Sequence, residues 1–158
     1  MKNDLVIDDE YFAFRIYNNY KSSVKDSITL RDNGNILDIC KDVNTGNIIY
    51  IEATIIESIY NDKIYLPDIR SDNDLILFPK AISNYNDERI PHFMINYDCD
   101  ELSIIFSSNI NPYYYYVDNR TEYYYDENLN LLYVKVINLT EEECKFLSSF
   151  NSSVSIFK

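Results

Sequence analysis

The sequence lacks tryptophan and contains only two glycines and one histidine in 158 residues. Loops that cradle phosphate groups need several glycines to bring backbone amides close to the ligand, so two glycines argue against nucleotide-dependent enzymes. The single histidine, His92, excludes a zinc site with two histidine ligands. We interpret His92 as a structural residue at a strand edge and expect no catalytic residues, no cofactor and no metal.

Cysteine is also scarce. The three residues are far apart, odd in number and form no Cys-x-x-Cys pair, a pattern typical of buried free thiols in a reducing compartment; they are Cys40, Cys99 and Cys144. The first residues lack the apolar stretch of a signal peptide. No apolar run approaches the ~20 residues that a membrane-spanning helix needs. These absences predict a soluble, cytoplasmic protein.

Acidic side chains are abundant by contrast. There are 26 acidic and 14 basic residues, which gives a formal net charge of −12. Such a charge repels nucleic acid and anionic membranes and accelerates association with basic proteins. The alternative is that the charge only keeps the protein soluble. We therefore predict a basic protein partner and expect neither direct nucleic-acid binding nor membrane binding.

The N-terminal half has the pattern of strands and hairpins. Residues 11–17 alternate with period two, with Phe12, Phe14 and Ile16 on one face. Asn33-Gly34 is a strong hairpin signal between 27–31 and 36–43, because both turn residues tolerate positive φ. A second turn at 44–47 contains the other glycine and precedes a β-branched run at 48–56.

The C-terminal half adds more strands and one helix. Thr140 and Glu143 form a capping-box signal for a short helix. Strands are predicted at 63–66, 75–78, 92–97, 102–107, 113–117, 121–125, 131–138 and 154–157. The expected fold is α+β and predominantly antiparallel β, with hairpins, a meander and a short C-terminal helix. We expect residues 1–158 to form a single globular domain.

Acidic residues recur in the predicted loops. Asp98, Asp100 and Glu101 lie in one turn, but they lack the spacing and the distal glutamate of an EF-hand loop. We interpret this group as a solvated hairpin turn. A divalent-metal site, which would support a metal-dependent hydrolase, is the alternative.

Tyrosine is the most unusual feature of the composition, with 16 residues, seven of them in PYYYYVDNRTEYYY at 112–125. Consecutive strand residues point to opposite faces, so we expect at least three of these phenols on an outward face, beside acidic residues. Tyrosine provides large contact area at low entropic cost and is enriched in protein-binding sites. Base stacking on these rings is the rival interpretation, which the surrounding negative charge disfavours.

In its size, acidity and tyrosine-rich and asparagine-rich hairpins, the chain resembles the small acidic immunity proteins of bacterial contact-dependent inhibition and polymorphic toxin systems. This resemblance implies a non-enzymatic protein that binds a basic cognate toxin domain, often a nuclease, and blocks it. An acidic phage or viral decoy of a host nucleic-acid-binding protein and a subunit of a larger assembly are alternatives. The predicted partner-binding residues are Tyr114, Tyr116, Glu122, Tyr124, Asp126, Asp98, Asp100 and Glu101.

Overall fold

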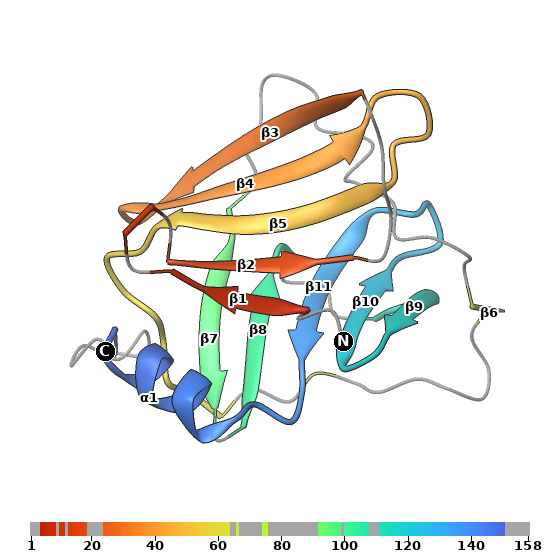
Figure 1. Cartoon of the computed structure of the whole chain (residues 1–158). Helices are drawn as coiled ribbons and strands as arrows, with labels where there is room; N and C mark the ends of the chain where they lie inside the picture. The colour runs from red at the N-terminus through yellow and green to blue at the C-terminus, as the bar shows by residue number, and fades with distance from the viewer. Residues whose placement is uncertain are drawn as a thin grey trace.

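The computed structural model contains two β-sheets and one short helix (Figure 1). It describes residues 4–8, 10–11, 13–18, 24–63, 66, 74–75, 92–98, 100–107 and 111–150. Both sheets are built almost entirely from antiparallel pairs, and one parallel pair among the described strands joins β6 (Asp74–Leu75) to β9 (Tyr114–Asp118). The predicted fold class, mostly antiparallel β with a short helix, is confirmed.

The first sheet has five strands in the order β1-β2-β5-β4-β3. They are β1 (Leu5–Ile7), β2 (Phe14–Tyr17), β3 (Lys25–Asp32), β4 (Asn35–Asp42) and β5 (Ile48–Ile55). The β3–β4 hairpin turns through Asn33 and Gly34 at φ 51° and 82°. Gly46, at φ 74°, lies in the next turn. Both turns follow the glycine positions because a positive φ is costly for most other residues.

The second sheet has six strands in the order β6-β9-β10-β11-β8-β7. They are β6 (Asp74–Leu75), β7 (Met94–Asp98), β8 (Glu101–Ile105), β9 (Tyr114–Asp118), β10 (Thr121–Tyr125) and β11 (Leu131–Val136). The hairpin at 98–101 and the meander of β9, β10 and β11 are confirmed.

A hydrophobic core joins the two sheets. Phe14 and Ile51 from the first sheet and Ile95 and Val134 from the second belong to one buried cluster. The strands of the first sheet run across those of the second at a steep angle (Figure 1). The inner faces of the two sheets meet at this core, and each sheet has an outer face on its other side.

The helix α1 (Glu141–Ser148) begins with the predicted capping box. The Thr140 hydroxyl accepts a hydrogen bond from the Glu143 amide at 3.2 Å, and the Glu143 carboxylate accepts one from the Thr140 amide at 2.8 Å. Arg120 in the β9–β10 turn forms two hydrogen bonds of 2.7 Å to Glu143 and one of 2.9 Å to Asp4. These contacts tie the helix and the first strand to the second sheet.

Some predictions concern other parts of the chain. Phe12, Cys99, the strand at 154–157 and most of 75–78 lie outside the described residues. In the segment 63–66, Lys63 and Leu66 are described and neither belongs to a strand. Cys40 and Cys144 are free thiols. No helix formed by the described residues is long and apolar enough to cross a membrane.

Candidate functional site

The register of β9 and β10 divides the tyrosine run between two faces of the second sheet. Tyr123 lies opposite Tyr116, and Tyr125 lies opposite Tyr114. All four of these rings pack on the core between the sheets. Tyr124 points to the other face, where it belongs to a second hydrophobic cluster with Leu66, Ile105, Leu132 and Tyr133.

The predicted exposure of this run is wrong. Tyr124, expected to stand outward in solvent, is only 1% exposed and stacks on Tyr133 with ring centroids 4.7 Å apart. Tyr114 and Tyr116 are half-buried and lie on the face opposite to Tyr124. Of the seven tyrosines, Tyr113 alone is exposed. The reason is that the outer face of this sheet carries its own hydrophobic cluster, so neither face exposes a row of tyrosine rings to solvent.

Glu122 is also buried rather than exposed, at 3%. Cross-strand pairing places it beside Lys135, whose Nζ lies 3.8 Å from the Glu122 carboxylate and 4.0 Å from that of Glu101. The Tyr124 hydroxyl donates to Glu122 at 2.8 Å. Lys135 Nζ also lies 5.4 Å from the centre of the Tyr124 ring. We call Glu122, Tyr124, Lys135 and Glu101 the lysine cluster; its contacts satisfy buried polar groups internally.

The lysine cluster extends to the predicted acidic turn between β7 and β8. Burial raises the pKa of Glu101; Lys135 opposes this shift, while Glu122, Asp100 and Asp98 add to it by repulsion. Asp98 is half-buried, whereas Asp100 is exposed and its carbonyl accepts a hydrogen bond from Leu139 at 2.9 Å. The structure thus brings Glu101 and Glu122 to the same cation, Lys135. The sequence did not predict this shared contact.

Asp126 holds a turn. Its Oδ1 accepts hydrogen bonds from the amides of Asn128 and Asn130 at 2.8 and 2.9 Å, and its Oδ2 accepts one from the Asn130 side chain at 3.0 Å. This carboxylate therefore stabilises the β10–β11 connection. Among the described residues, no group of three or more His, Cys, Asp or Glu side chains is arranged to hold a metal ion.

A surface with the predicted chemistry does exist, on the outer face of the first sheet. Tyr17 and Tyr50 lie opposite each other on β2 and β5, with ring centroids 5.8 Å apart. Arg15 lies between them: its guanidinium carbon is 4.3 Å from the Tyr50 ring centre and 5.4 Å from that of Tyr17. It also donates a 2.6 Å hydrogen bond to the Tyr17 hydroxyl.

Two carboxylates complete this surface. Glu52, paired with Arg15 across the strands, forms an ion pair with it. The Thr54 hydroxyl lies 2.8 Å from Asp38 and 3.2 Å from Glu52, and Thr29 donates to Asp38 at 2.5 Å. Burial, followed by a hydrogen bond with Cys40, raises the pKa of Tyr50, which keeps its hydroxyl protonated. The set formed by Tyr17, Tyr50, Arg15, Glu52, Asp38 and Thr54 is called the tyrosine–carboxylate face below.

Sequence reasoning missed this face, although the signal was present. Ile49, Ile51 and Ala53 alternate along β5 with Tyr50, Glu52 and Thr54. Period two requires the polar set to point away from the core. The predicted binding residues instead follow the dense tyrosines at 112–125, which lie on and beside β9 and β10 of the second sheet.

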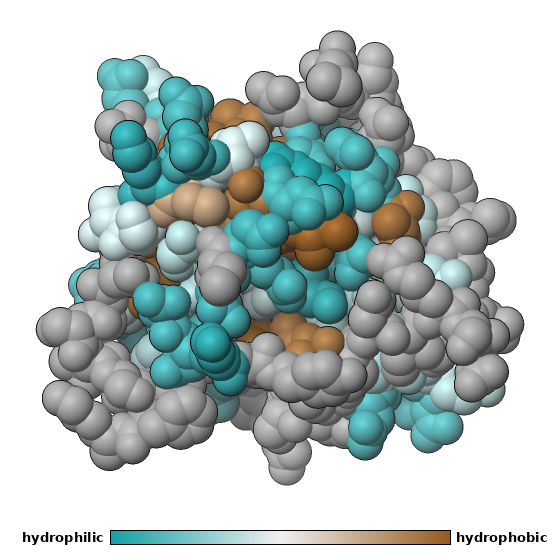
Figure 2. Space-filling model, turned by 90° about the horizontal axis from the view of Figure 1, so that it is seen from below, coloured by the Kyte–Doolittle hydropathy of each residue, from teal (hydrophilic) through white to brown (hydrophobic). Residues whose placement is uncertain are grey.

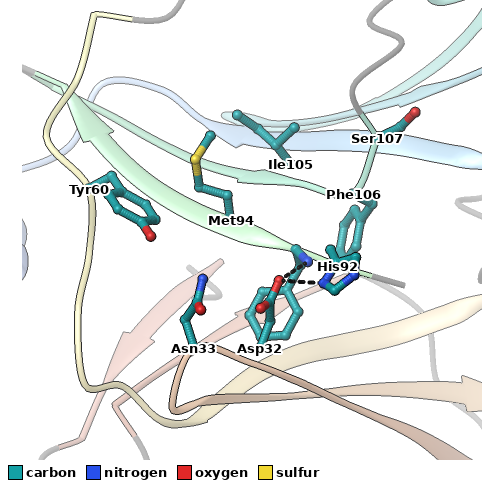
Figure 3. A pocket seen from close by; sticks show the side chains of 9 residues that line it. Asp32, Asn33, Tyr60, His92, Met94, Ile105, Phe106 and Ser107 are labelled. Atoms are coloured by element: carbon teal, nitrogen blue, oxygen red, sulfur yellow. Dashed lines mark hydrogen bonds and ion pairs between the residues drawn. The ribbon is translucent and has the colours of Figure 1, made fainter. Parts of the chain in front are cut away.

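A separate pocket of about 600 Å³ opens where the β3–β4 turn meets the ends of β7 and β8 (Figure 3). The described residues that line it are Asp32, Asn33, Tyr60, His92, Phe93, Met94, Ile105, Phe106 and Ser107. The His92 ring nitrogen Nδ1 lies 3.2 Å from Asp32 Oδ2. The side chain of His92 is 92% exposed. Sequence reasoning gave no sign of this pair, which joins residues 60 positions apart.

The described part of the underside, which includes α1, is mostly hydrophilic. Figure 2 shows hydrophilic residues over most of the described part of this view, broken by small hydrophobic patches. In α1 the first turn carries Glu141 and Glu142, which are exposed and suit the positive end of the helix dipole. These acids are explained by helix stability alone.

No protein-family model matches this chain, and no curated protein matches it either.

Proposed function

We propose that this chain is a non-enzymatic protein that binds and neutralises a basic toxin domain, and that the tyrosine–carboxylate face is its docking surface. The observation that carries the proposal is the arrangement of Tyr17 and Tyr50 around Arg15. Large aromatic side chains that are held in place before binding lose little entropy when a partner docks on them. The proposal moves the docking site from the second sheet to the first.

The contacts within the face explain why it suits a protein partner. Arg15 contacts both rings and is held by Glu52, so the two phenols keep a fixed spacing. Glu52 and Asp38 lie on adjacent strands and offer carboxylate oxygens beside the rings. Aromatic and arginine side chains are the residues most enriched at the centres of protein interfaces.

The net charge of −12 supports a basic partner. Charge of one sign accelerates encounter with a partner of the other sign and makes the association rate depend on ionic strength. On this view the whole chain steers the encounter, while the tyrosine–carboxylate face supplies the contacts that keep the complex together.

The test is to capture the partner from the source cell, identify it and measure its binding kinetics by surface plasmon resonance. We expect Tyr17→Ala with Tyr50→Ala to weaken binding by about 30-fold or more, mainly through faster dissociation. Tyr113→Ala is the control, since Tyr113 is 50% exposed and directly precedes β9 of the second sheet, away from the tyrosine–carboxylate face. Equal effects of the control and the double variant would contradict the assignment of the face.

Two further measurements address the partner class. Expression of the captured partner's catalytic domain is expected to be toxic, and co-expression of this chain is expected to restore growth. The association rate is expected to fall steeply as the salt concentration is raised from 50 to 500 mM. Salt screens exposed charges strongly over this range, since the Debye length is already about 10 Å at 0.1 M. A salt-independent rate would remove the electrostatic part of the proposal. A captured partner that is a host nucleic-acid-binding protein without toxicity would favour the decoy function instead.

A further inference from the structure

The pocket beside His92 has the size and the lining of a small-molecule site. Its volume of about 600 Å³ lies within the range of known ligand pockets, roughly 300–1,000 Å³. Such pockets are mainly apolar, with a few convergent polar groups that orient the ligand. None of its lining residues belongs to the tyrosine–carboxylate face, so this inference is independent of the proposed function.

The apolar part of the pocket comes from the ends of two adjacent strands. Met94 on β7 pairs with Ile105 on β8, and Phe106 follows directly. Phe93, Ile105 and Phe106 are each less than 10% exposed, whereas Met94 is half-buried. In Figure 3, Tyr60 lies at one end of the pocket and Phe106 and Ser107 lie at the other, with Met94 between them. This lining suits a flat or branched hydrocarbon group.

The polar part is dominated by one carboxylate. Oδ2 of Asp32 accepts a hydrogen bond from the Phe93 amide at 3.1 Å and lies 3.2 Å from His92 Nδ1. The other oxygen, Oδ1, has no hydrogen-bond donor among the described residues. The Asp32 side chain is 15% exposed, so this oxygen lies in partly desolvated surroundings where a charged donor binds it more strongly than in water.

The charges around the pocket favour a cation. No lysine or arginine occurs among its described lining residues. The net charge of the chain, −12, adds a field that attracts cations. The two contacts on Oδ2 hold the Asp32 carboxylate at the rim of the pocket. One of them comes from the backbone amide of Phe93, which directly precedes β7.

We infer that this pocket binds a small organic amine, with its ammonium group on Oδ1 of Asp32 and its hydrocarbon body against Met94, Ile105 and Phe106. His92 Nδ1 lies beside Oδ2 of the same carboxylate, which leaves Oδ1 for the ammonium group. The hydroxyl of Tyr60 lies at the far end of the pocket, where it limits the length of the hydrocarbon body.

The experiment compares three probes that share one phenylethyl skeleton: phenethylamine, 2-phenylethanol and phenylacetate. Binding to the full chain is followed by backbone amide shifts in ¹H–¹⁵N NMR spectra. We expect the amine to bind tightest and phenylacetate weakest, with shifts centred on Phe93, Met94, Ile105 and Phe106. Equal affinities for the three probes, or shifts elsewhere on the chain only, would overturn the assignment.

Two variants separate the charge from the cavity. Asp32→Asn is expected to weaken phenethylamine binding by about tenfold to a hundredfold and to leave 2-phenylethanol binding within about threefold, since it removes the charge and keeps the shape. Ile105→Trp is expected to abolish binding of both probes by filling the pocket. Should Asp32→Asn fail to fold, Ile105→Trp with a preserved NMR spectrum remains the test. Unchanged amine affinity in either folded variant would contradict the inference.

Discussion

The two outer sheet faces contain similar side chains in very different surroundings. On the first sheet, Arg15 lies beside Glu52 and two tyrosines. The side chains of this ion pair are 23% exposed for Arg15 and 14% exposed for Glu52. On the second sheet, Lys135 lies beside Glu122 and Tyr124, and its ion pair is only 7% and 3% exposed. Each set combines a cation, carboxylates and phenols across neighbouring strands.

The difference teaches that composition alone does not identify a binding surface. An apolar row crosses four strands beside the charged groups of the lysine cluster and packs with Leu66. It consists of Met94, Ile105, Tyr133 and Tyr124. Burial of this row takes the neighbouring polar groups out of water, so they must satisfy one another. On the first sheet the corresponding ion pair is 23% and 14% exposed, so it keeps partial contact with water.

The largest expected effect comes from removing the cation on each face. Lys135→Met leaves Glu122 as a buried carboxylate without its cation, which costs about 3–5 kcal/mol of stability. Arg15→Met is expected to cost less, because the Glu52 side chain is 14% exposed and keeps more contact with water than Glu122 at 3%. The free energy of unfolding in urea, measured for both variants, checks the contrast.

A double variant tests the reason for that contrast. Lys135→Met with Glu122→Leu removes both charges and is expected to recover most of the loss, since well-packed apolar residues replace buried ion pairs at little cost. Equal losses for Lys135→Met and Arg15→Met would show that the two faces do not differ in burial as described.

A smaller contrast concerns single hydroxyl groups. Tyr124→Phe removes a donor to the buried Glu122 and is expected to destabilise by about 1–3 kcal/mol. Tyr17→Phe removes the acceptor of an Arg15 hydrogen bond near the surface and is expected to cost about 0.5–1 kcal/mol. Thermal unfolding of the two variants measures the difference, and the reverse order would contradict it.

The pH dependence of the unfolding free energy sharpens the contrast between the two sheet faces further. Burial raises the pKa of Glu101 above its ordinary 4.5, so its contribution to stability is present below about pH 4.5 and is lost as the pH rises through the raised value. Glu101→Gln is expected to lack this decline in unfolding free energies measured by urea titration between pH 4 and 7.

Glu143 supplies the control of opposite sign. Burial would raise its pKa, but hydrogen bonds from Arg120 and Thr140 lower it overall. Its contribution is therefore present above about pH 4.5 and is lost as the pH falls through the lowered value. In Glu143→Gln this loss on acidification is expected to disappear; a change of the same sign in both variants would rule out the assigned shifts.

The smallest effect is expected at the rim of the tyrosine–carboxylate face. Thr29→Val removes an exposed hydroxyl that donates to Asp38 and keeps the β-branched shape that suits a strand. The free energy of unfolding is expected to change by no more than about 0.5 kcal/mol. A larger loss would show that the contacts around Asp38 serve the fold rather than a docking surface.

The local elements followed from the sequence because their signals are local. Alternation located β2, β3, β4 and β5 of the first sheet and most strands of the second, and the glycines marked both hairpin turns. It missed β1, which has only three residues and is too short to show a period of two. Thr140 and Glu143 located the helix through its capping box. A bulge opposite Tyr124 and Tyr125 shifts the register. The adjacent residues Leu132 and Tyr133 therefore pack in the same cluster, which alternation alone does not predict.

The sequence by itself determined most of the strand pattern, the glycine turns, the start of the helix and the net charge of −12. Only the tertiary structure decided which tyrosines are accessible, because exposure depends on what packs against each sheet face rather than on alternation within one strand. It also brought Asp32 to His92 and Glu122 to Lys135, pairs that long-range strand pairing and sheet packing create. Local pattern fixes where a side chain points, and the fold fixes what it meets there.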